Sequence, residues 1–264
     1  MMEEIQQCLQ DSMQEVLRGG ARGARSGLEK IEGSIWQTYQ ALPKNEFGHI
    51  GPRAVRYLVH NYFAKEHGWL IKGLEPHGHQ TDVSEVHEVN ILQDKAPALV
   101  ESLLESQRAG RGLALQDAVA MVATLERLIF DEAIKLLQTS YKLNSLAMEK
   151  PLDEAGIHEV LTSYLILFEM GDRAMLQNAN LHRALKTRAA EVGGNWPLLV
   201  EFEQDAVSNF GFTHKHIRNP FLSTPKFAFE DAVEIVEGLT ADYGKWQNTE
   251  CQQMKSELME LDSQ

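Results

Sequence analysis

Apolar residues recur at helical spacing along almost the whole chain of 264 residues. Val55, Leu58, Val59, Tyr62 and Phe63, for example, follow the spacing that places side chains on one face of a helix. We find no convincing stretch in which apolar and polar positions alternate, the pattern of a half-buried strand. The sequence therefore predicts an all-α protein, built as a multi-helix bundle.

Caps and breakers divide this pattern into helices. Pro52 and Asp153 are suited to helix starts, whereas Pro43 and Gly68 are suited to helix ends. The expected helices cover residues 5–17, 28–42, 52–67, 84–92, 97–107, 115–143, 153–170, 172–192, 197–210 and 227–261. We expect a break in the last of them near Gly244, because glycine costs up to about 1 kcal/mol relative to alanine inside a helix.

Glycine and proline also predict how the chain is divided. Residues 1–27 combine an amphipathic helix with the Gly/Arg-rich linker GGARGARSG. Residues 28–150 form a first helical lobe, which ends where Lys150 meets Pro151. Residues 151–264 form a second lobe with a long acidic C-terminal helix. The sequence thus predicts two helical lobes after an N-terminal arm.

The charge balance excludes several classes of partner. The chain has 25 Lys and Arg residues and 38 Asp and Glu residues, a net charge of -13, which is the wrong sign for binding nucleic-acid phosphates.

No apolar run approaches the roughly 18 residues of a membrane span, and the acidic N-terminus differs from a signal or transit peptide. Cys8 and Cys251 lack disulfide-framework or metal spacing, so we expect an intracellular, cytoplasmic protein.

Catalytic signatures are missing from the sequence. GxSxG, HExxH and P-loop motifs in the right context do not occur. The carboxylate pairs Glu201 with Glu203 and Asp131 with Glu132 are not three or four residues apart, so we interpret them as solvated helix surface. We assign no catalytic residue and expect a protein that is not an enzyme.

A histidine-rich stretch offers a second hypothesis. His77, His79 and His87 lie close together, and imidazole nitrogens bind zinc and other divalent metals. The alternative is that they are solvated loop histidines, since Pro76 and Gly78 favour a flexible turn. The corresponding function is a metal-binding protein or metalloenzyme.

Residues 210–229 are basic and aromatic in an otherwise acidic chain. Lys215, Arg218 and Lys226 are candidates for holding an anion or an acidic partner above the phenylalanines. In the alternative interpretation the phenylalanines anchor this stretch to the core and the cations cover nearby carboxylates.

A weak internal repeat links the two lobes. LALQDAVAMVATL at 113–125 aligns without gaps with FAFEDAVEIVEGL at 227–239, and six of these thirteen positions are identical. Any two helices with an apolar staple, a cap and an apolar face share part of this pattern. Both segments also resemble the end of an EF-hand loop and its outgoing helix. In that resemblance Leu113 and Phe227 occupy loop position 8, and Asp117 and Asp231 occupy position 12.

Two further segments resemble the same family, one with Gly48 at position 6 and Ile50 at position 8, the other with Leu152 at position 8. The resemblance implies helix-loop-helix units paired in two lobes, 28–130 and 131–245. Calcium needs six to eight oxygen ligands, whereas the ligand positions of the loop near Leu42 hold Pro43, Asn45, Phe47, Gly51 and Ala54. We therefore expect a degenerate form without tight calcium binding, whose groove between helices binds a helical protein partner or a second copy.

Overall fold

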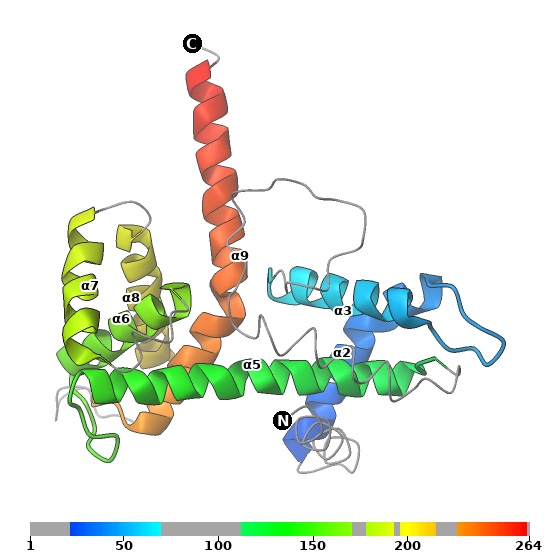
Figure 1. Cartoon of the computed structure of the whole chain (residues 1–264), viewed down its shortest axis with the longest axis horizontal. Coiled ribbons are helices and arrows are strands. Elements are labelled where there is room, and N and C mark those ends of the chain that lie inside the picture. Colours follow the sequence, from blue (N-terminus) through cyan, green and yellow to red (C-terminus); the bar gives the residue numbers. More distant parts are fainter. Residues whose placement is uncertain (1–21, 70–111, 171–177, 193–195, 215–225, 263–264) are drawn as a thin grey trace. The chain divides into compact units, whose positions relative to one another are not determined.

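The computed structural model describes residues 22–69, 112–170, 178–192, 196–214 and 226–262. Within these ranges the chain forms seven α-helices and no strand. Figure 1 labels these helices. The prediction of an all-α, multi-helix protein is confirmed. The helices expected at 5–17, 84–92 and 97–107 lie outside the described residues.

The chain divides into two compact units, Met1–Ile129 and Phe130–Gln264. The division falls inside α5 (Leu115–Leu143), close to residue 130 and before the limit at Lys150 expected from Pro151. The two ends of α5 have different partners, which explains the position of the division. Glu126 accepts a hydrogen bond from Tyr62 of the first unit, whereas Asn144, which follows the helix, donates one to Ser163 of the second.

The first unit contains α2 (Arg22–Ala41), α3 (Pro52–Glu66) and the first half of α5. Pro52 opens α3, and Gly68 follows its end with a φ of 71°. The buried residues of α3 are those of the apolar pattern: Val55, Leu58, Val59, Tyr62 and Phe63. The expected core face of this helix is therefore confirmed.

A short antiparallel bridge joins the two loops of the first unit. Ile50 and Leu113 exchange both backbone hydrogen bonds, each 3.0 Å long. Gly112 permits this approach, because it has a φ of 69° and a Cβ there would lie 2.7 Å from the Ile50 carbonyl oxygen. The Tyr39 hydroxyl donates to the Leu113 carbonyl oxygen at 3.3 Å.

The second unit contains the second half of α5 with α6 (Glu154–Met170), α7 (Ala179–Val192), α8 (Trp196–Thr213) and α9 (Phe229–Asp262). Figure 1 shows α6, α7 and α8 grouped together, and α8 also packs against α9. The buried side of α8 carries Leu199, Glu203, Val207 and Phe210. Helix α8 is thus the central element of this unit.

The second unit repeats the bridge of the first. Leu152 and Phe227 exchange two backbone hydrogen bonds of 2.8 Å. The helices that follow Leu113 and Phe227 also begin alike. Asp117 accepts the Ala114 N–H at 3.1 Å, and Asp231 accepts the Ala228 N–H at 2.8 Å. Each aspartate thereby satisfies a backbone donor at its own helix start.

Two expectations about helix limits are wrong. Helix α2 begins at Arg22, inside the segment assigned to a Gly/Arg-rich linker. Helix α9 continues through Gly244 without a break, because Gly244 is buried beside the aromatic contact of Tyr243 with Trp246. Packing offsets the low helix propensity of glycine at this position. No helix in the described ranges is long and apolar enough to cross a membrane.

Candidate functional site: a groove between α8 and α9

A groove with a volume of about 410 Å³ lies between α8 and α9. The two helices run antiparallel along it. Phe202, early in α8, stacks on Trp246 of α9 with ring centroids 5.0 Å apart. Phe210, late in α8, lies 6.3 Å from the ring of Phe227, which precedes α9. Aromatic contacts therefore fix the helix pair near both ends of the groove.

The floor of the groove is apolar. Phe202, Ala206 and Phe210 are four residues apart along α8, so they form one row on its surface. Ile235 and Leu239 form the facing row of α9. Phe210, Ile235 and Leu239 are buried, and the other two are half-buried. The apolar surface that a ligand can reach on this floor therefore comes mainly from Phe202 and Ala206.

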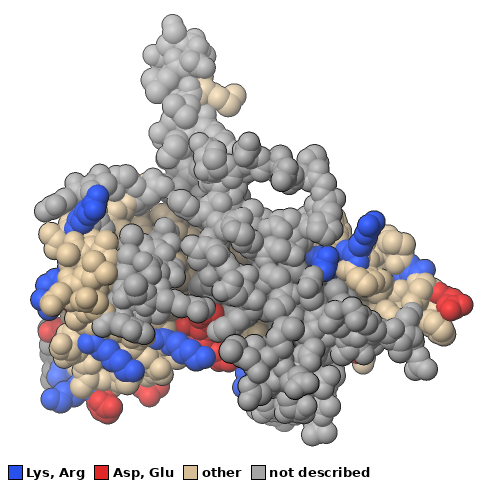
Figure 2. Space-filling view, viewed as in Figure 1, with Lys and Arg blue, Asp and Glu red and all other residues tan. Residues whose placement is uncertain are grey.

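The edges of the groove are polar and exposed. They follow the same four-residue spacing, with one row on each helix: Asp205, Asn209 and Thr213 on α8, and Glu234, Gly238 and Asp242 on α9. Among the described residues that line the groove, three are carboxylates and none is Lys or Arg. The charge differs elsewhere on the molecule, since Figure 2 shows Lys and Arg side chains over α7. The groove is therefore apolar within and acidic at its edges.

Gly238 has no side chain, so it leaves part of the α9 edge of the groove uncovered. It lies inside α9, between Glu234 and Asp242 in the exposed row. A Cβ built at Gly238 meets no atom within 4 Å, so packing does not require glycine here. A larger side chain at this position would extend into the open space beside the groove.

His214 directly follows the end of α8 and contacts the edge of the groove that α9 forms. Its ring stacks on Phe210 with centroids 4.0 Å apart, and its Nε2 atom lies 3.5 Å from Glu234 Oε1. A contact of this length between partly exposed groups contributes little to stability. It does, however, connect the end of α8 to the acidic row of α9.

Behind the groove, a buried carboxylate joins α8 to α6. Glu203 is 2% exposed, and both its oxygens lie near His158 Nδ1, at 2.9 and 3.0 Å. Burial raises the pKa of Glu203 to about 7, and His158 opposes this rise. The interpretation of Glu203 as solvated surface is therefore wrong. The signal in the sequence was its place between Leu199 and Val207 on the apolar face of α8.

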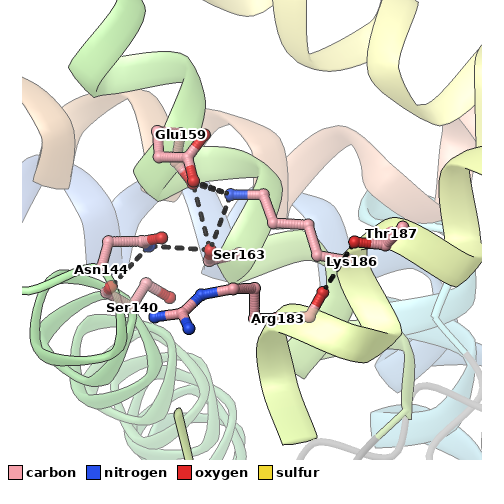
Figure 3. A network of polar contacts seen from close by, with 7 residues as sticks. All are labelled: Ser140, Asn144, Glu159, Ser163, Arg183, Lys186 and Thr187. Atoms are coloured by element: carbon pink, nitrogen blue, oxygen red, sulfur yellow. Dashed lines mark hydrogen bonds and ion pairs between the residues drawn. The ribbon is translucent and has the colours of Figure 1, made fainter. Parts of the chain in front are cut away.

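A second polar cluster, in Figure 3, contains a serine and a lysine in contact. Lys186 Nζ of α7 donates to Ser163 Oγ of α6 at 3.2 Å and forms an ion pair with Glu159 at 2.7 Å. Ser163 is buried and donates to the Glu159 carbonyl oxygen, while Asn144 donates to Ser163 Oγ. A buried hydroxyl with these bonds is not presented to a substrate, so the cluster joins helices.

The residues singled out in the sequence are mostly outside the described ranges. This holds for His77, His79 and His87, and for Lys215 and Arg218. Lys226 is described and exposed, and it directly precedes the bridge residue Phe227. Within the described residues, no group of three or more His, Cys, Asp or Glu side chains could hold a metal ion.

Sequence reasoning missed the groove because its edge residues have ordinary helix-surface spacing. Asp205 and Asp242 become neighbours of one groove only when α8 and α9 pack as an antiparallel pair. Comparison of the chain with protein-family models, curated proteins and solved structures gives no match.

Proposed function

We propose that the protein is a non-enzymatic interaction module, built from degenerate EF-hand-like helix pairs, that binds a helical segment of another protein between α8 and α9. The observation that carries this proposal is the groove itself. Two apolar rows between two exposed rows match an amphipathic helix, whose apolar stripe would cover the floor.

The paired loops support the EF-hand-like part of the proposal. The two bridges join Ile50 to Leu113 and Leu152 to Phe227, which are the four residues that the resemblance places at loop position 8. Gly48, at position 6, has a φ of 76°. These contacts between the four residues are what supports the EF-hand-like part of the proposal.

The first loop is held by protein groups where a calcium loop would use its ion. Asn45 Oδ1 accepts the backbone N–H groups of Phe47 and His49, each at 3.0 Å. Lys44 Nζ donates to the carbonyl oxygens of Tyr39 and Gln40 at the end of α2, at 2.9 and 3.0 Å. An ammonium group at a helix C-terminus is electrostatically favourable. The proposal accordingly assigns this loop a packing role.

Selection of helical peptides from a displayed library against the full chain tests the proposal. We expect the selected peptides to carry apolar residues at i, i+3 or i+4, and i+7. Gly238→Met should abolish their binding, because Gly238 lines the groove and the new side chain would occupy space that the ligand needs. The matched variant Gly211→Met should retain binding, since Gly211 also has open space around its Cβ but does not line the groove. Ligands without helical periodicity, or equal binding by both variants, would overturn the proposal.

A further inference from the structure

The charge and dimensions of the groove define its partner more closely, on the assumption that the proposed function is correct. We propose that the α8–α9 groove takes a basic amphipathic helix, with an apolar stripe on its floor and Lys or Arg side chains along both edges.

The arrangement of carboxylates carries this inference. Asp205 lies on the α8 edge, and Glu234 and Asp242 lie on the α9 edge, so negative charge flanks the apolar floor on both sides. All three side chains are exposed, and the lining residues that the structure describes include no cation. Lys or Arg side chains on both sides of the apolar stripe of a ligand helix would lie next to these carboxylates and be attracted to them. Asp or Glu side chains at the same positions would be repelled.

The same argument disfavours two occupants from this chain. A second copy carries a net charge of -13, so its approach to an acidic groove is opposed. The amphipathic segment 1–17 contains Glu3, Glu4, Asp11 and Glu15 and no Lys or Arg. The groove therefore fits a partner of opposite charge better than self-association.

The length of the groove along α8 sets the length of the ligand. From Phe202 to Thr213 there are eleven residue steps, which span about 16 Å along α8 at 1.5 Å per residue. A ligand helix of about three turns covers this length. Its apolar residues would face Phe202, Ala206 and Phe210 on one side and Ile235 and Leu239 on the other.

Fluorescence anisotropy with designed peptides and the full chain tests the charge. One peptide places leucines at helical spacing with lysines elsewhere, its acidic twin has glutamates in place of the lysines, and a third scrambles the Leu/Lys sequence. We expect the Leu/Lys peptide to bind about tenfold more tightly than its acidic twin, because its lysines would meet the three edge carboxylates. It should also bind more tightly than the scrambled peptide, which has no continuous apolar stripe. Added salt should weaken its binding.

Variants connect this result to the groove. The triple variant Asp205→Asn, Glu234→Gln, Asp242→Asn should bind the Leu/Lys peptide about tenfold more weakly and reduce its preference over the acidic twin. Gly238→Met should lose binding, and Gly211→Met should keep it.

Two results would overturn the inference in different ways. Equal binding of the basic and acidic peptides, lost in Gly238→Met, would leave the groove as a helix site but remove its charge preference. A chain that sediments as a dimer, and as a monomer after Gly238→Met, would identify a second copy as the occupant. Failure of all helical peptides, including library-selected ones, would instead refute the proposed function.

Discussion

The two units share a framework but differ in what they build on it. In the described part of each, a reciprocal backbone bridge is followed by a helix that an aspartate caps. Each also has a histidine in contact with a glutamate. In the first unit His67 lies 2.8 Å from Glu126, and in the second His158 lies 2.9 Å from Glu203.

The surroundings of these two glutamates differ. One carboxylate oxygen of Glu126, Oε1, is hydrogen-bonded to both Tyr62 and His67. The ring of His67 stacks on the ring of Trp69, with centroids 4.4 Å apart. Glu203 is more deeply buried, has a raised pKa, and lies on the helix that forms one wall of the groove. The shared framework therefore serves folding, and the features of α8 and α9 carry the proposed binding role.

The largest expected effect comes from breaking the bridge of the first unit. Gly112→Ala places a Cβ 2.7 Å from the Ile50 carbonyl oxygen in a left-handed backbone conformation. The conformation costs roughly 1–2 kcal/mol and the disturbed backbone hydrogen bonds about 1 kcal/mol each, so we expect a loss of about 3 kcal/mol. Urea unfolding measures the loss, and hydrogen exchange should assign it to residues of the first unit.

Gly33→Ala is the matched control for that change. Gly33 lies inside α2 of the same unit, and a Cβ there meets no atom within 4 Å. Its replacement should leave stability unchanged or slightly higher. Equal destabilisation by the two variants would show that Gly112 is not needed for the bridge.

The buried glutamate of the second unit predicts a dependence on pH. Its pKa rises from 4.5 to about 7 on folding, so the folded state retains a proton that the unfolded state releases. The stability that Glu203 contributes is full below pH 4.5 and is lost as the pH rises towards 7. At about 1.36 kcal/mol per pKa unit the loss is about 3 kcal/mol at most.

Glu203→Gln isolates this contribution, because the amide is neutral at every pH and other titrating groups are common to both proteins. Between pH 5 and about 7 the stability of the wild type should fall relative to the variant. Urea unfolding across this interval measures the difference. Parallel curves for the two proteins would contradict the raised pKa of Glu203.

The sequence predicted the helices well and the site poorly, for a physical reason. Helix periodicity and caps are local, and the expected limits of the helices at 115–143 and 153–170 agree with the structure to within one residue. The groove depends on which faces of α8 and α9 meet, and that arrangement is not encoded by spacing within either helix. Glu203 lies between these two cases. Its charge favours an exposed position, whereas its apolar neighbours on the same face of α8 favour a buried one.

A smaller effect tests whether the shared caps are equivalent. Asp117→Ala and Asp231→Ala each remove the carboxylate that accepts a backbone N–H at a helix start. We expect each to lower the unfolding free energy by about 1 kcal/mol. Urea unfolding with matched Asn variants measures these losses, and Asn should recover part of each because its side-chain oxygen still accepts. An unchanged stability in one variant would show that the two helix starts are not equivalent.

The smallest expected effect is a gain. Gly238→Ala adds a methyl group inside α9 where no atom lies within 4 Å, so we expect stability to rise by about 0.5–1 kcal/mol. The methyl group is too short to fill the groove, so binding of a helical peptide should persist, in contrast to Gly238→Met. Thermal unfolding and peptide anisotropy on the same samples measure both properties. Higher stability with retained binding would show that folding does not require glycine at Gly238, whereas lost stability would mean that the space beside this edge is not open.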